Sequence, residues 1–184
     1  MNVYDFDNTI YDGDSSVDFY LFVLFRKPYL FIFLPFQIWS MVLFLTGIYS
    51  KERMKESFFI FLRYISVYEM VSKFWKIKNK KIKSWYLQQK MDSDLIISAS
   101  PEFLLEQMVC GYLGVKLIAS LIDINTCKFI GNNCYGNEKI VRIFKKYPDC
   151  VIEKFYSDSL SDTPLAHIAK KAFLIQKNVI TEWK

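Results

Sequence analysis

At 184 residues, the chain is long enough to bury one hydrophobic core with one inserted subdomain, and too short for several large domains. A hydrophobic content of 52% and an aromatic content of 18% exclude an intrinsically disordered chain and leave a globular or membrane-associated protein. The net charge of +5 is uneven, because residues 14–91 contain 13 Lys or Arg against 5 Asp or Glu, whereas the other residues are more acidic than basic.

The first predicted element is a short buried strand at residues 2–7, which ends in two acids one residue apart. A turn follows, and then a predicted helix at residues 17–25 that Ser15 or Ser16 could cap. The next stretch, residues 28–50, contains no charged residue at all.

Residues 51–90 are rich in Lys and in apolar residues at helical spacing, which predicts two or more helices. Beyond them, predicted strands alternate with predicted helices, and this alternation is typical of an open, mostly parallel sheet. The strands are expected at 94–100, 115–124, 151–156 and 172–176, and the helices at 102–113, 136–147 and 163–171. The sequence therefore predicts an α/β fold with a Rossmann-like, mostly parallel sheet.

The break in composition predicts the domain boundaries. Residues 1–13 plus 92–184 are expected to form the α/β core. Residues 14–91, which carry 20 of the 33 aromatic residues, are expected to form an all-helical, basic insertion after the first strand.

Polar side chains follow several predicted strands at their carboxyl ends, where ligands bind in open α/β sheets. Together with a lysine at a helix start they form a set of six: Asp5, Asp7, Ser98, Lys139, Asp158 and Asp162. Four carboxylates close together require a positive charge between them, and Mg²⁺, which prefers oxygen ligands, meets that need. Each residue alone has a plain structural explanation, such as a turn acid, a solvated lysine or a helix cap. Their joint occurrence instead favours a catalytic site.

The order of these residues resembles the four motifs of the haloacid dehalogenase-like (HAD) phosphohydrolases. The segment Asp5-Phe-Asp-Asn-Thr9 resembles the first motif, and the apolar run that ends in Ser98 resembles the second. Lys139 resembles the third motif, and Asp158 with Asp162 resembles the fourth.

Two positions depart from the family pattern. Asn8 and Ser159 stand where the family frequently has glycine. Neither replacement removes a chemical group that the reaction needs. The resemblance covers nearly the whole chain, because the four motifs bracket the insertion.

The resemblance implies a role for each residue of the set. Asp5 would be the nucleophile that forms an aspartyl-phosphate, and Asp7 would be the general acid and base. Because residues i and i+2 of a strand share a face, both could reach one phosphate. Ser98 and Lys139 would bind the phosphoryl oxygens, with Thr9 supporting the loop through its hydroxyl. Mg²⁺ would be held by Asp5, Asp7 (through its backbone carbonyl), Asp158 and Asp162, and Asp14 would be a candidate for substrate specificity.

In this family, an insertion after the first motif is a cap that closes over the active site, and residues 14–91 occupy that position. A helical cap resembles the phosphoserine phosphatase-like branch. The uncharged stretch 28–50 is long enough to span a bilayer. A single crossing would separate the site residues, so we expect an even number of crossings, a re-entrant hairpin or a helix in the interface. The basic, aromatic run 73–83 would contact anionic lipid.

The cap composition also resembles that of bacterial phosphatidylglycerophosphate phosphatases of the HAD type. The function predicted first is Mg²⁺-dependent hydrolysis of a phosphomonoester, on a phospholipid head group at the cytoplasmic side of the membrane. The alternatives are a soluble cytoplasmic phosphatase of the phosphoserine type and a non-catalytic membrane adaptor. Residues 28–50 could instead pack within the cap or form a homodimer interface. No nucleic-acid partner is expected, because the apolar stretch would have no role in binding one.

Overall fold

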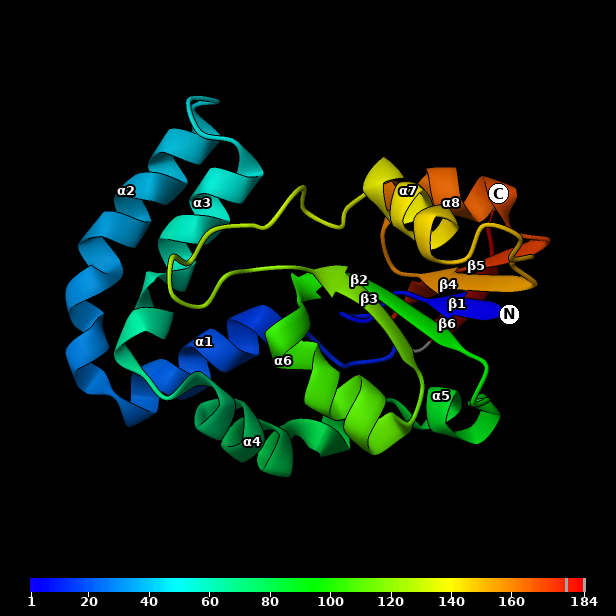
Figure 1. Ribbon diagram of the computed structural model, residues 1–184, viewed down its shortest axis with the longest axis horizontal. Coiled ribbons are helices and arrows are strands. Elements are labelled where there is room, and N and C mark those ends of the chain that lie inside the picture. The colour runs from blue at the N-terminus through cyan, green and yellow to red at the C-terminus, as the bar shows by residue number, and fades with distance from the viewer. Residues whose placement is uncertain (178, 184) are drawn as a thin grey trace.

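A six-stranded sheet forms the centre of the protein (Figure 1), whose computed structural model describes residues 1–177 and 179–183. The strand order is β3-β2-β1-β4-β5-β6, and all neighbouring strands run parallel except the last pair. The strands are β1 (Asn2–Tyr4), β2 (Leu95–Pro101), β3 (Lys116–Ser120), β4 (Lys154–Ser157), β5 (Lys171–Gln176) and β6 (Val179–Glu182). The predicted α/β fold with a mostly parallel sheet is therefore confirmed.

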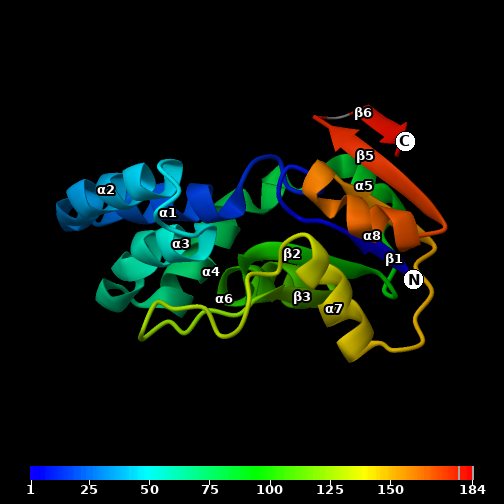
Figure 2. The same cartoon turned by 90° about the horizontal axis from the view of Figure 1, so that it is seen from above.

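Helices cover both faces of this sheet (Figures 1 and 2). One face carries α6 (Glu102–Glu106), which continues as a π-helical segment to Leu113; the other carries α7 (Asn137–Lys146) and α8 (Thr163–Ile168). The side chains of β1 alternate accordingly, since Val3 packs into the α7/α8 core and Tyr4 into the opposite one. A sheet buried on both faces explains why its strands are almost continuously apolar.

The chain between β1 and β2 folds into five helices, of which the first four extend beyond the carboxyl ends of the strands and the fifth packs against the sheet (Figure 1). These are α1 (Ser15–Arg26), α2 (Leu34–Leu45), α3 (Lys51–Phe59), α4 (Val67–Lys78) and α5 (Ser84–Gln89), with 3₁₀ turns at Pro28–Phe33, Ile60–Tyr64 and Asn79–Lys81. We call α1–α4 with their connecting turns the cap. The apolar helix α2 lies on its outer side, next to α3.

The cap and the sheet share one hydrophobic core. Phe74 of α4 is fully buried, and the neighbouring Trp75 packs edge-on against Phe6, with ring centroids 6.1 Å apart. The Trp75 indole N–H also donates a hydrogen bond of 2.6 Å to the backbone oxygen of Leu104 in α6. Because these contacts join the cap to the turn after β1, the cap position is fixed where the site lies.

Several predicted boundaries were wrong. The strand at residues 2–7 ends at Tyr4, because the Phe6 carbonyl accepts hydrogen bonds from the backbone N–H groups of Ile10 and Tyr11 and closes a turn. Helix α1 is capped by Asp14, whose carboxylate accepts from the Val17 N–H at 3.0 Å, and by neither serine predicted for this role.

The C-terminal half contains further differences. Strand β3 ends at Ser120, four residues before the predicted end, and β4 begins at Lys154 after an extended segment. Helix α8 ends at Ile168 because β5 already begins at Lys171. The antiparallel edge strand β6 was not predicted, since its short sequence lacks a clear turn signal of glycine or proline.

The burial of α4 side chains in the core predicts how substitutions on this helix change the free energy of unfolding. Replacing the buried Phe74 by Ala should lower the free energy of unfolding by about 3–5 kcal/mol, because the substitution leaves a cavity among the rings of Phe19, Phe22 and Trp75. Tyr68→Ala on the same helix is the control, since Tyr68 is 66% exposed and its loss should cost about 0.5 kcal/mol or less. Urea unfolding measures both. Equal effects would contradict the burial of Phe74 in the hydrophobic core.

Candidate active site

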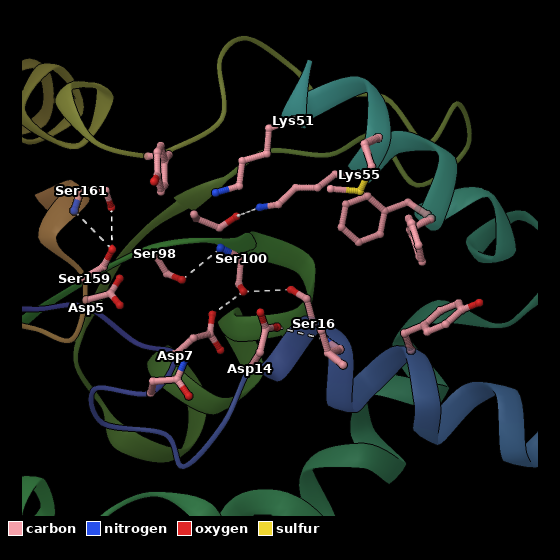
Figure 3. Close-up of a pocket in the computed structure, with 18 of the residues that line it drawn as sticks. Asp5, Asp7, Asp14, Ser16, Lys51, Lys55, Ser98, Ser100, Ser159 and Ser161 are labelled. Atoms are coloured by element: carbon pink, nitrogen blue, oxygen red, sulfur yellow. Dashed lines mark hydrogen bonds between the residues drawn. The ribbon is translucent and has the colours of Figure 1, made fainter. Parts of the chain in front are cut away.

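A cavity of about 550 Å³ lies between the carboxyl ends of the strands and the cap (Figure 3). Its wall on the sheet side is polar and contains all six residues of the predicted set. Its wall on the cap side comes mostly from α1, α2 and α3 and is largely apolar. The cavity lies beside β1 and β4, where the strand order reverses, which is the usual ligand position in such sheets.

Lys139 lies at the centre of the polar wall. Its ammonium donates to Asp5 at 2.7 Å and to Asp162 at 2.6 Å, and all three residues are buried. Although burial alone would lower it, these two carboxylates raise the pKa of Lys139. Lys139 is therefore a fixed positive charge, carried into the site by the first turn of α7.

Asp5 follows directly after β1, and its backbone N–H continues the strand pairing by donating to Tyr156 at 2.8 Å. Burial raises the pKa of the Asp5 carboxyl to about 7, and Asp162 adds to the rise whereas Lys139 opposes it. A buried carboxylate with such a pKa is poised to interact with a further positive charge. Asp5 lines the cavity, so a positively charged group in the cavity could reach its carboxylate.

Asp7 lies in the turn after β1 and not within a strand. The alternation of strand side chains, which we expected to put it on the same face as Asp5, therefore does not apply. Two hydrogen bonds hold Asp7 instead, from the Ser15 N–H at 2.6 Å and from the Ser100 hydroxyl at 2.5 Å. Burial raises the pKa of Asp7 to about 6, with the neighbouring Asp14 contributing. Asp5 and Asp7 line the same cavity, as predicted, but a turn and not a strand brings Asp7 there.

The first and last motifs are joined through Thr9. Its hydroxyl accepts a hydrogen bond of 2.9 Å from the Asp158 N–H, and it lies 3.5 Å from the carboxylates of both Asp5 and Asp158. Thr9 is fully buried, so it supports the loop and does not face the cavity. Ser98 lines the cavity at the end of β2, where its hydroxyl oxygen accepts from the Ser100 N–H at 3.0 Å.

The two departures from the family pattern have local explanations. Asn8 has a φ of +55°, a left-handed conformation that glycine and asparagine both adopt. Its carbonyl accepts a hydrogen bond from the buried Lys83. Ser159 has an ordinary φ of −112° and caps the following turn by accepting from the Ser161 N–H. Neither position requires glycine here.

The donor set suits a magnesium ion. Within residues 1–177 and 179–183, no three Asp, Glu, His or Cys side chains converge closely enough to chelate an ion alone. One buried acceptor, Asp162 Oδ1, has no hydrogen-bond partner among the described residues, while Oδ2 binds Lys139 and the Ser157 hydroxyl. Mg²⁺ commonly takes only one or two carboxylates and completes its shell with carbonyl and water oxygens, so this set fits it.

Sequence reasoning missed four cavity or supporting residues. Ser100 orients Asp7, and Ser157 donates to Asp162 at 2.7 Å. The spacing of Ser98 and Ser100 along β2 could have indicated the first, because alternate strand residues share a face. Lys51 and Lys55 of α3 also line the cavity, and no signal in the sequence separated them from the other cap lysines.

Asp14, the candidate for substrate specificity, has a structural role as well as a place in the cavity wall. It lines the cavity and is exposed, and its carboxylate caps α1. Its capping role is shown by the structure, and its role in specificity stays a prediction.

The chain matches the haloacid dehalogenase-like hydrolase family over residues 3–167. Because the match covers most of the chain, the protein belongs to this family, as the four motifs predicted. The match also supports the predicted phosphatase class, since the family consists of hydrolases. No curated protein sequence matches the chain.

Three solved structures share the fold. A protein of unknown function from Bordetella pertussis is 18% identical with a TM-score of 0.75, over 94% of this chain and 87% of that one. A phosphoserine phosphohydrolase-like protein from Francisella tularensis is 16% identical with a TM-score of 0.54, over 97% and 90%. A HAD family hydrolase from Salmonella enterica serovar Typhi is 10% identical with a TM-score of 0.61, over 91% and 59%. At these identities, the likeness shows the fold alone.

The raised pKa values predict how stability depends on pH. In magnesium-free buffer the folded protein binds more protons than the unfolded chain between about pH 4 and pH 7, because Asp5 and Asp7 titrate near 7 and 6 instead of 3.8. The free energy of unfolding should therefore fall as pH rises from 5 to 8, by on the order of 4 kcal/mol for the two groups together.

Urea unfolding of Asp5→Asn should show a clearly smaller fall over the same pH range. Asp12→Asn is the control, because Asp12 is exposed in the adjacent turn and its removal should leave the fall unchanged. Identical pH slopes in wild type and Asp5→Asn would contradict the buried, raised Asp5.

Proposed function

We propose that the protein is a Mg²⁺-dependent phosphomonoester hydrolase that works through an aspartyl-phosphate and acts on a phospholipid head group. The observation that carries the proposal is the arrangement of Asp5 and Asp7 on one cavity, with Lys139 bound to the first and not to the second. Two carboxylates in different environments are suited to different tasks.

Asp5 would be the nucleophile, attacking the phosphorus atom and releasing the alcohol of the substrate. Lys139 supports this role because it holds Asp5 in place and can stabilise negative charge on the phosphoryl oxygens. Ser98 would donate its hydroxyl to the same oxygens, since it lines the cavity beside them. Bound Mg²⁺ would be held by the Asp5 and Asp158 carboxylates and the Asp7 carbonyl, with water oxygens completing its shell and Asp162 contributing directly or through one of these waters. It would neutralise the repulsion between the phosphate and the nucleophile.

Asp7 would protonate the leaving alcohol and then take a proton from the water that hydrolyses the aspartyl-phosphate. A pKa near 6 suits a group that must both give and accept a proton near neutral pH. The hydrogen bonds from Ser15 and Ser100 fix the carboxylate orientation for both steps. Because Ser15 begins α1, the cap itself helps to position the acid.

The apolar half of the cavity supports a lipid substrate. Beyond the carboxylates, the wall consists of side chains such as Leu21, Met41, Met54 and Phe58. Val17 and Leu21 are 51% and 42% exposed, so this apolar wall continues to the molecular surface along α1. A phosphate ester with hydrocarbon chains would match a cavity that is acidic at one end and apolar at the other.

The outer surface of the cap supports contact with a membrane. Pro28–Leu45 has the length and hydropathy of a membrane-crossing segment, and only 17% of it is buried. Its large exposed residues include Ile32 at 77%, Trp39 at 61% and Leu45 at 75%. Soluble monomers rarely expose so many large apolar side chains on one segment.

The chain geometry favours a helix lying on the membrane or re-entering it over a single crossing. The segment is preceded by α1 and followed by α3, and both of these helices line the cavity. In the run 73–83, Phe74, Trp75 and Lys83 are buried, so only the exposed part of the run could meet lipid. That part consists of Ile77 and the exposed lysines Lys73, Lys76 and Lys80. The proposed lipid contact therefore lies mainly on the exposed face of Pro28–Leu45.

A soluble phosphatase of the phosphoserine type is the second candidate. The observation that favours it is the fold shared with a phosphoserine phosphohydrolase-like protein, together with Asp14, which lines the cavity and could face a substrate amine. The apolar half of the cavity has no role in this alternative.

Phosphate release with Mg²⁺ from phosphatidylglycerophosphate in mixed micelles and from free phosphoserine separates the two candidates. Release from the lipid is expected, with a loss of about a thousandfold or more in Asp5→Asn and after EDTA treatment. Asp12→Asn should retain full activity. Release from phosphoserine alone would favour the soluble phosphatase, and no release from either would favour a non-catalytic role.

Membrane contact is tested by flotation with anionic phospholipid vesicles. The double variant Ile32→Ser/Trp39→Ser should bind about tenfold or more weakly, because two large apolar side chains no longer enter the lipid. Val141→Ser/Leu160→Ser, which changes exposed apolar residues of the core domain, is the matched control. Unchanged binding would contradict the proposal, and a dimer that the first variant dissociates would favour a cap-mediated interface.

A further inference from the structure

Two lysines in the cavity lie outside the proposed reaction. Lys51 and Lys55 belong to α3, and Figure 3 shows their side chains extending from that helix toward Ser98 and Ser100. The Lys55 ammonium donates to the Ala99 carbonyl at 3.3 Å, between these two serines in the chain. The Lys51 ammonium lies over the Tyr135 ring, 3.9 Å from its centroid. Both cations are thus held at the mouth of the phosphate site.

Neither lysine stabilises α3. Among the residues that the structure describes, neither ammonium forms a salt bridge. Lys51 occupies the first position of the helix, where a positive charge opposes the helix dipole. The two lysines are also four residues apart, so like charges repel on one face. Burial lowers the pKa of Lys55, and Lys51 lowers it further. A bound anion would relieve each of these costs.

The position of the pair along α3 indicates which part of a substrate it meets. The next turn of the same face carries Phe58 and Phe59, which line the apolar half of the cavity. The lysines therefore lie between the carboxylates that would receive the scissile phosphate and the aromatic residues that would receive an apolar tail. Lys139 is already engaged by Asp5 and Asp162, so it does not serve this second position.

We propose that Lys51 and Lys55 bind a second anionic group of the substrate, separate from the phosphate that is hydrolysed. This inference rests on the proposed phosphomonoesterase function and narrows its substrate class. In a lipid the second anion would be a phosphodiester between the terminal phosphate and the acyl chains, and in a soluble substrate it would be a carboxylate. Substrates with a single phosphate and no other anion would bind more weakly.

Binding to protein that cannot turn over tests this inference independently of catalysis. In an Asp5→Asn background, the Kd of short-chain phosphatidylglycerophosphate should be about 10- to 100-fold lower than that of short-chain phosphatidate, which lacks the second anion. Phosphoserine and phosphoethanolamine form the corresponding soluble pair.

Added Lys55→Met or Lys51→Met should remove most of the preference within whichever pair shows it, while the weaker ligand of that pair binds as before. Lys80→Met is the matched control, because it removes the same charge from an exposed part of the cap outside the cavity. Equal affinities within both pairs, or a preference that survives both lysine variants, would overturn the inference. If the preference is found but wild type releases no phosphate, the proposed function fails and the anion subsite stands.

Discussion

The ion triad of Asp5, Lys139 and Asp162 is the interaction on which the site depends. Carboxylates gathered in a buried place repel one another and lose solvation, and one lysine bonded to two of them offsets part of that cost. The triad ties β1 to α7 and to the turn after β4, three segments that are far apart in the sequence. Among the residues that the structure describes, Asp7 and Asp158 form no salt bridge, and this supports the proposed binding of a dication beside them.

The cap completes the site because it shares its core with the sheet. Trp75 packs α4 against Phe6 and Tyr11 of the turn that contains Asp7, and α1 supplies the Ser15 N–H that orients Asp7. The same packing directs one face of α3 into the cavity and leaves α2 outside. A chain that buries its aromatic residues at this joint thereby forms a cavity with an acidic end, a basic middle and an apolar end.

The sequence predicted which polar residues line the cavity, because they stand at the ends of the predicted strands and at a helix start. Asp5, Ser98, Lys139 and Asp158 needed only the α/β pattern to bring them together. Asp7 reached the same cavity through a turn closed on the Phe6 carbonyl, a detail that hydrophobic alternation cannot distinguish from a longer strand. Phe74 and Trp75 looked suited to lipid contact, yet tertiary packing buried them. Lys51 and Lys55 could not be singled out among the cap lysines, because their role depends on which face of α3 meets the sheet.

We propose above that Asp5 receives the phosphoryl group. The most direct measurement is an acid quench of wild type during turnover of a reactive aryl phosphate with Mg²⁺, followed by peptide mass spectrometry. We expect one added phosphoryl group on Asp5. It should be absent from Asp5→Asn and should accumulate in Asp7→Asn, where hydrolysis of the intermediate lacks its base. Steady phosphate release with no covalent adduct, or an adduct on another residue, would contradict it.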